Sequence, residues 1–171
     1  MMNSIKRALA LVLALVICIA AAACMSACNG EQSTEDEGTD IYYIEYKGTK
    51  IKLGEAAEGV LKALGDAKSV KELGDCGGLG AQVKYTYDDF DLYTLKSGDK
   101  ETIDQISFRS DLVSTSKGIC IGDGEAKVNE AYGDDFTVSK GVRSYVDGNL
   151  VLKISIANGA VDAIEFIRVT G

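Results

Sequence analysis

The sequence predicts an α+β domain: a tandem repeat of a helix plus an antiparallel three-stranded meander, forming one sheet with two helices packed on one face. The first observation behind this prediction is an internal duplication, which indicates an architecture before any propensity is weighed. One set of residues recurs at an offset of 68, namely Ile51-Lys52-Leu53-Gly54 with Leu64-Gly65-Asp66, and Ile119-Cys120-Ile121-Gly122 with Tyr132-Gly133-Asp134. A second set recurs at an offset of 58, namely Tyr87, Asp89, Leu92, Asp104, Ile106 and Phe108, and Tyr145, Asp147, Leu150, Asp162, Ile164 and Phe166. The change of offset indicates a ten-residue insertion between Gly65 and Tyr87.

Hydrophobic periodicity, the second observation, predicts the elements of the first repeat. Ala57, Val60, Leu61 and Leu64 have the i, i+3, i+4, i+7 spacing of one buried helical stripe. We expect, in order, strands over 41–46 and 49–53, a helix over 55–64, a glycine-rich loop over 66–83 with a short turn at 70–73, and strands over 83–87, 90–95 and 102–109.

Turn chemistry, the third observation, predicts the second repeat. Asp147-Gly148 and Asn158-Gly159 are strong hairpin signals, because type I′ turns need positive φ at both central residues. We expect, in order, a short strand over 118–121, a helix over 123–132, and strands over 142–146, 150–157 and 160–169. Residues that both copies share are expected to be scaffold. A specific function is expected in what they do not share: residues 66–83 and the unrepeated aromatic residues.

The first 27 residues have the anatomy of a secretory signal. Lys6 and Arg7 precede an uncharged apolar stretch over 8–19, followed by small residues and cysteine. A membrane-spanning helix is the alternative for this stretch. Residues 28–40 contain no large apolar side chain and are expected to be a flexible acidic linker. The remaining residues, 41–171, are expected to form the tandem-repeat domain, with repeat one at 41–110 and repeat two at 117–171.

Two cysteines near the end of the signal resemble the lipobox of bacterial lipoproteins. Cys28 follows Ser26-Ala27 and is the favoured lipidation site, and Cys24 after three alanines is the alternative. The resemblance implies a diacylglyceryl cysteine as the first mature residue, anchoring the chain at the extracytoplasmic face of the bacterial cell membrane. Two acyl chains give the stable anchoring that a single chain does not. Plain secretory cleavage is the other interpretation.

Composition excludes several classes of function. The chain has a net charge of −8 at pH 7, which becomes −10 when Lys6 and Arg7 leave with the signal. This acidity argues against nucleic acid as a partner. The chain contains no histidine, so histidine-based triads and histidine-ligated zinc are excluded. Enzymes that use Ser–Lys pairs or paired carboxylates are not supported by any spacing. We therefore expect a non-enzymatic protein, with no catalytic residues and no cofactor.

Three further patterns are weighed as candidate sites. Cys76 and Cys120 are the remaining cysteines and predict a disulfide between the repeats, two separate thiols being the alternative. The aromatic residues Tyr85, Phe90 and Tyr93 predict a binding face on the open side of the sheet, and core packing is the alternative. Acidic clusters such as 88–91 lack the spacing of a calcium loop, so no metal site is expected.

The repeat also resembles a known family. The segment 119–123, with Val128 and Tyr132-Gly133, matches its helix signature, and Tyr85-Thr86-Tyr87 with Phe90 matches the strand that follows. In these residues the chain resembles the tandem-repeat lipoproteins of Gram-positive bacteria, whose fold is similar to β-lactamase inhibitor protein and to the small outer-membrane-assembly lipoproteins. The resemblance covers residues 45–169. It implies a concave sheet face, opposite the helices, that grips an envelope or secreted protein. An extracytoplasmic solute- or glycan-binding lipoprotein is the alternative.

Overall fold

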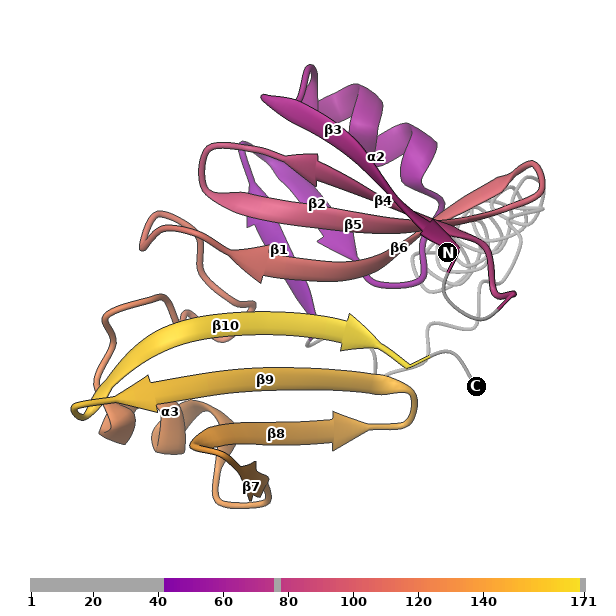
Figure 1. Cartoon of the computed structure of the whole chain (residues 1–171). Helices are drawn as coiled ribbons and strands as arrows, with labels where there is room; N and C mark the ends of the chain where they lie inside the picture. Colours follow the sequence, from indigo (N-terminus) through magenta and orange to yellow (C-terminus); the bar gives the residue numbers. More distant parts are fainter. Residues whose placement is uncertain (1–41, 76–77, 170–171) are drawn as a thin grey trace, which may run out of the picture. The chain divides into compact units, whose positions relative to one another are not determined.

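The structure is a computed structural model that describes residues 42–75 and 78–169 (Figure 1). Its elements are, in chain order, β1 (Tyr43–Tyr46), β2 (Thr49–Lys52), α2 (Ala57–Leu64), β3 (Ser69–Asp75), β4 (Ala81–Thr86), β5 (Phe90–Ser97), β6 (Lys100–Phe108), α3 (Glu125–Tyr132), β7 (Thr137–Ser139), β8 (Val142–Asp147), β9 (Leu150–Ala157) and β10 (Ala160–Arg168). The predicted signal over 1–27, the linker over 28–40 and the cysteines Cys24, Cys28 and Cys76 lie outside the described residues.

Eight strands form one antiparallel sheet in the order β3-β4-β5-β6-β10-β9-β8-β7. Strands β3–β6 make up its first half and β7–β10 its second half, and the halves meet where β6 pairs with β10 (Figure 1). This seam is short, with Ile106 paired to Phe166 at its centre. Strands β1 and β2 pair with each other as a separate two-stranded sheet, and Ile44 of β1 also forms a single β-bridge with Thr115.

The predicted α+β class is therefore wrong, because the described residues are mostly β. They contain only two helices, of eight residues each, and each helix is followed by four strands rather than a three-stranded meander. The extra strands are β3 and β7, which lie at the two edges of the sheet. The physical reason is that an edge strand needs pairing on one side only and buries little, so it lacks the hydrophobic alternation that marks an inner strand.

Strand β3 is the clearest case, since all seven of its residues are exposed. It lies inside the stretch predicted to be a loop, residues 66–83. Its glycine at position 74 has φ +89° and lies where the register with β4 shifts, so this glycine marks a β-bulge and not a break in the strand. At the end of the insertion Gly80 has φ +126°, and a Cβ there would clash with the backbone carbonyl of Lys96. The strand predicted over 118–121 is also wrong: these residues form a loop outside the described strands, with Ile119 buried.

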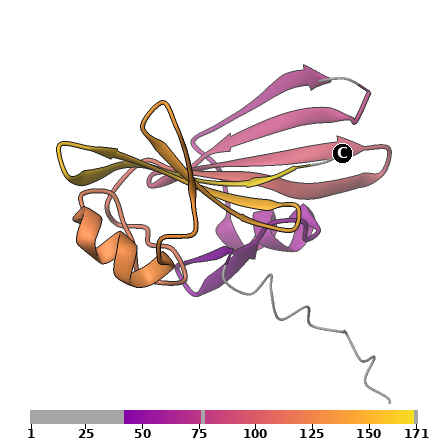
Figure 2. The same cartoon turned by 90° about the horizontal axis from the view of Figure 1, so that it is seen from below.

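The helices α2 and α3 and the β1–β2 hairpin all lie on one side of the eight-stranded sheet (Figure 2). Val60 of α2 and Val128 of α3 are buried there with Ile44 and Ile51 of the hairpin, in the same apolar core as the sheet residues. Burying each such aliphatic side chain stabilises the fold by about 1.5–3 kcal/mol. The core therefore forms on this side only, which we call the helix face. None of the described helices is long and apolar enough to span a membrane.

Candidate functional site

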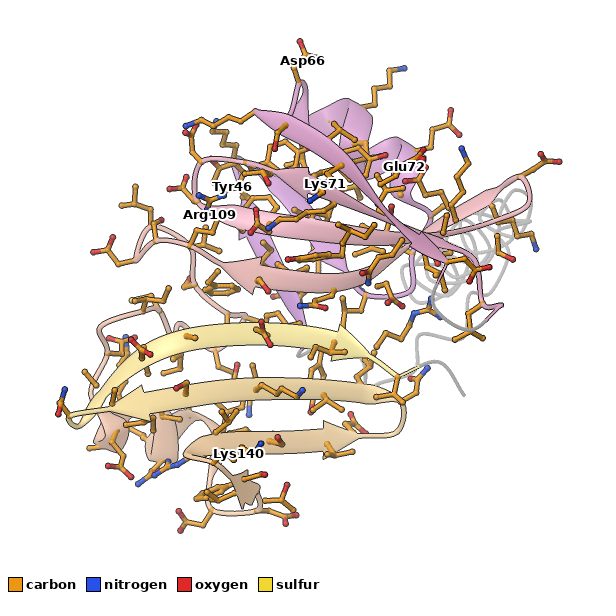
Figure 3. All side chains as sticks on the ribbon, viewed as in Figure 1. Tyr46, Asp66, Lys71, Glu72, Arg109 and Lys140 are labelled. Atoms are coloured by element: carbon orange, nitrogen blue, oxygen red, sulfur yellow. The ribbon has the colours of Figure 1, made fainter. Side chains whose placement is uncertain are left out.

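The other side of the sheet, the open face, carries no helix or further strand among the residues that the structure describes (Figure 2). Residues directly opposite each other on paired strands point to the same side, so the register assigns each side chain to one face. Leu92 pairs with Ile106, which pairs with Phe166, and all three are fully buried on the helix face. Their chain neighbours therefore point to the open face, which Figures 1 and 3 view directly.

Two rows of side chains cross this face. The first, the polar row, runs over all eight strands without one apolar residue: Ser69, Thr86, Asp91, Ser107, Glu165, Lys153, Ser144 and Thr137. The second, the mixed row, is polar at one end and apolar at the other: Lys71, Lys84, Tyr93, Gln105, Ile167, Val151 and Val146. The face thus offers hydrogen-bonding groups along its length and an apolar patch at one end.

On the first half, Asp91 is the centre of a charge cluster. Its carboxylate lies 2.8 Å from Lys84 Nζ and 3.2 Å from Arg109 Nη1, and the Asp91 side chain is 11% exposed. Burial alone would raise the pKa of Asp91, but hydrogen bonds from Lys84, Thr86 and Arg109 outweigh it and hold the pKa below its ordinary value. The hydrogen bond to Asp91 in turn raises the pKa of Lys84. The Lys84 ammonium also lies 5.4 Å from the centre of the Tyr93 ring.

On the second half, the open face is hollowed. A hollow of 310 Å³ is lined by Ser139, Lys140, Val142, Ser144, Lys153 and Glu165. We call it the β7–β10 hollow, because its residues come from those four strands and the turn between β7 and β8. Figure 3 labels Lys140 in this half, and Lys71 and Arg109 in the first half. Lys153 lies at its centre, directly opposite Ser144 on one side and Glu165 on the other.

The predicted aromatic binding face is only partly on this side of the sheet. Tyr93 pairs with Lys84 and belongs to the open face. Phe90 is fully buried, with its ring 5.1 Å from that of Tyr87, and Tyr85 is directly opposite Leu92 on the helix face. The prediction is therefore corrected for Tyr85 and Phe90, to which the alternative of core packing applies. The physical reason is that residues of odd number in β4 face the core, so Tyr85 follows Val83 and Tyr87 inward.

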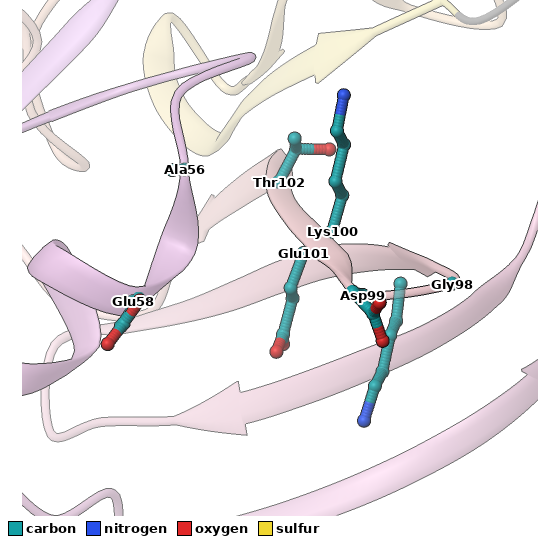
Figure 4. Close-up of a pocket in the computed structure, with 8 residues that line it drawn as sticks. Ala56, Glu58, Gly98, Asp99, Lys100, Glu101 and Thr102 are labelled. Atoms are coloured by element: carbon teal, nitrogen blue, oxygen red, sulfur yellow. The ribbon is translucent and has the colours of Figure 1, made fainter.

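Tyr85 instead bonds Glu101, which lines a second hollow of 640 Å³ between the start of α2 and the β5–β6 turn. Its hydroxyl donates to Glu101 Oε1 at 2.9 Å, and the buried Thr94 hydroxyl donates to the same oxygen at 2.6 Å. Burial and the bond to Glu101 raise the pKa of Tyr85 to about 12. Figure 4 shows Glu101 and Glu58 in this hollow. Charged residues of both signs line it: Glu58, Lys96, Asp99, Lys100 and Glu101.

Cys120 carries a free thiol in the structure. Its Sγ donates to Asp123 Oδ2 at 3.3 Å, and its backbone N–H donates to the same oxygen at 2.8 Å. Burial and the carboxylate of Asp123 raise the pKa of the thiol, so it is a weak nucleophile at neutral pH. The partner predicted for it, Cys76, lies outside the described residues, and the disulfide stays a prediction. Within the described ranges, no three Cys, Asp or Glu side chains are placed to hold a metal ion.

Sequence reasoning missed the polar row and the Asp91 cluster. Asp91 was grouped with Asp88 and Asp89 as an acidic turn, although it lies inside β5. The sequence does contain a signal for the polar face. In β4 the even positions Gln82, Lys84 and Thr86 are polar, which is the alternation typical of a strand with one solvent-exposed face. What the alternation does not reveal is which polar residues of different strands meet.

Comparison with protein-family models, with curated proteins and with solved structures finds no match to this chain. Function must therefore be inferred from the site itself.

Proposed function

We propose that this chain is an extracytoplasmic lipoprotein, anchored to the cell membrane through Cys28, that binds an envelope or secreted protein with the open face of its sheet. The proposal assigns it no catalysis. The observation that carries it is the open face: a wide sheet surface without a covering layer among the described residues, with a polar row beside an apolar patch. A sheet of this width usually has both faces covered, or one face that is polar and exposed to solvent. An exposed apolar patch on the open face therefore indicates a partner that covers it.

The composition of the open face suits a protein partner. Val146 is 64% exposed, and Val151 and Ile167 beside it are half-buried, so the patch is accessible. Protein interfaces combine apolar area with polar groups that supply hydrogen bonds, and the open face offers both. The tyrosine of the mixed row, Tyr93, is of the type enriched among residues that dominate binding energy.

The chain offers a matched pair of positions to test which face binds. Val146 and Val138 are 64% and 62% exposed and lie on the neighbouring strands β8 and β7. Val146 is directly opposite Val151 on the open face, whereas Val138 is directly opposite Arg143, which points to the helix face and bonds Asn129 of α3. A photo-crosslinking amino acid at position 146 in full-length protein is expected to give an adduct in cell envelopes, and the same group at 138 is not.

A charge in the patch gives the corresponding binding test. Val146→Arg is expected to weaken capture of the crosslinked partner by about tenfold, because an unpaired charge would be buried in the interface. Val138→Arg should leave capture unchanged. Thermal unfolding of both variants controls for folding. Equal crosslinking from the two positions, or equal loss on substitution, would contradict binding by the open face.

The anchoring half of the proposal has its own test. Radiolabelled palmitate is expected to enter the wild-type chain and to be lost in Cys28→Ser. Cys24→Ser should keep the label. If only Cys24→Ser loses it, the anchor is at Cys24. Absence of label in the wild type would reject the lipoprotein assignment while leaving the binding face untouched.

The alternative of a solute- or glycan-binding lipoprotein is favoured by one observation, the 640 Å³ hollow beside the β5–β6 turn, whose volume lies within the range of small-molecule pockets. Binding there predicts that Glu101→Gln abolishes retention on glycan or solute arrays. The substitution Val146→Arg should then have no effect on that retention, which separates the two functions.

A further inference from the structure

The β7–β10 hollow is lined by hydrogen-bond donors that have no partner among the described residues. Lys140 and Lys153 form no ion pair with any described residue, and the hydroxyls of Ser139 and Ser144 make no hydrogen bond within the described ranges. All four side chains line the same 310 Å³ space. Glu165 is the one carboxylate in its lining, and its Oε1 accepts a hydrogen bond from Ser107, across the seam, at 3.1 Å.

The first half of the open face has a corresponding position, where the cations are paired with a carboxylate of the chain itself. Asp91 and Lys153 hold the same position in the polar row, each on the third strand from its edge of the sheet. At Asp91 a carboxylate from the chain itself neutralises the cations Lys84 and Arg109. At Lys153 the charge is reversed. Glu165, to one side on β10, is the one carboxylate in the described lining. No second carboxylate in that lining neutralises the two cations.

We infer that the β7–β10 hollow receives a carboxylate side chain, an aspartate or glutamate, from the protein that docks on the open face. This inference rests on the proposed function and adds the chemistry of the partner. A carboxylate accepts about four hydrogen bonds, and two ammonium groups with two hydroxyls supply donors for all of them. The carboxylate of Glu165 in the lining disfavours a doubly charged phosphate more than a singly charged carboxylate, because like charges repel in proportion to their charge.

A peptide titration tests the hollow without the unknown partner. Acetyl-triglutamate amide is added to the ¹⁵N-labelled full-length chain in detergent, with acetyl-triglutamine amide as the uncharged control. Amide signals of Ser139, Lys140, Ser144 and Lys153 are expected to shift with triglutamate and not with triglutamine. Lys140→Gln and Lys153→Gln should each weaken binding about two- to fivefold, the range of an exposed ion pair. Lys71→Gln, an exposed lysine on the same face in the first half, is the matched control and should not weaken binding.

Shifts spread evenly over all surface lysines, or binding that Lys153→Gln and Lys71→Gln weaken equally, would overturn the inference. The two proposals fail separately. If position 146 still crosslinks a partner but Lys140→Gln and Lys153→Gln leave its capture unchanged, the partner binds without a carboxylate in the hollow, and only this inference is lost. If triglutamate binds the hollow but position 146 crosslinks nothing, the hollow stands and the protein-binding face is rejected.

Discussion

On the first half of the open face Asp91 accepts hydrogen bonds from two cations, whereas on the second half the residue in the same place is Lys153, with no ion pair among the described residues. The two halves have the same strand order from edge to seam, so the difference lies in side chains and not in topology. Charges that are satisfied within the chain contribute to stability and are unavailable to a partner. Charges left without a partner inside the chain contribute no such stability and are available to a partner. The contrast therefore separates a half whose open-face cations are neutralised within the chain from a half whose lysines remain available for a partner.

The helix faces of the two halves show no such difference. Tyr87 and Tyr145 are both buried, and so are Phe108 and Phe166, whose rings lie 6.0 Å apart across the seam. The duplicated residues thus form one core shared by both halves, and the unshared residues of the open face are where the halves diverge.

The largest effect is expected from breaking the shared core. Phe166→Ala should lower the free energy of unfolding by about 3–5 kcal/mol, because the ring is fully buried and the cavity cannot collapse completely. Urea unfolding followed by circular dichroism should show a single transition at lower urea. A first transition that removes only part of the signal would mean that the halves unfold independently, and the comparison between them would then concern two domains.

The next effect tests the open faces directly. Asp91→Asn should cost about 1.5–3 kcal/mol, since it removes charged hydrogen bonds from a largely buried carboxylate and leaves Lys84 without its partner. Lys153→Gln, at the equivalent place, should change stability by less than about 0.5 kcal/mol. Urea unfolding at pH 7 measures both. Equal losses from the two substitutions would contradict this difference between the open faces of the two halves.

The pH dependence of stability sharpens the same contrast. The folded state lowers the pKa of Asp91, so its stabilising contribution is complete above the unfolded value of about 3.9 and is lost as the pH falls through the folded pKa. Unfolding curves of wild type and Asp91→Asn should therefore converge as the pH falls below about 3.9. In Lys153→Gln the difference from wild type should stay constant over this range. A wild-type advantage over Asp91→Asn that does not shrink as the pH falls below about 3.9 would show that the carboxylate charge is not its source.

The smallest effect compares the second strand of each half. On the helix face Tyr85 of β4 bonds Glu101, whereas Arg143, in the same place on β8, forms an ion pair with Glu125 of α3. Tyr85→Phe should cost about 1 kcal/mol, the net value of one hydrogen bond. The raised pKa of Tyr85, about 12, means that this contribution is present below the ordinary value near 10 and lost as the pH rises through 12. Absorbance titration at high pH should lose one late-titrating tyrosine in the variant; loss of a tyrosine that titrates near 10 instead would contradict the raised pKa of Tyr85.

Sequence reasoning found the inner elements better than the edges and the site. The hairpin turn at Asn158-Gly159 is confirmed, with φ +53° and +78°, and each predicted helix ends at the residue expected and begins two residues late. These features depend on residues close together in the chain. The edge strands β3 and β7 were missed because their exposed residues carry no periodic pattern. Tyr85 and Phe90 were assigned to the wrong face because aromatic character was weighed above strand parity.

What the sequence determined by itself is the local order: which stretches are inner strands or helices, where tight turns fall, and that residues such as Ile106 and Ile164 serve alike in both copies. Only the tertiary structure decided that β6 pairs with β10, and hence that the polar row is continuous and Ser107 reaches Glu165, 58 residues away. The physical reason is that the alternation of apolar residues specifies which face a side chain takes, while its neighbours on that face depend on strand order and register. Those are decided by how the whole apolar core packs, with residues from both halves and the β1–β2 hairpin together.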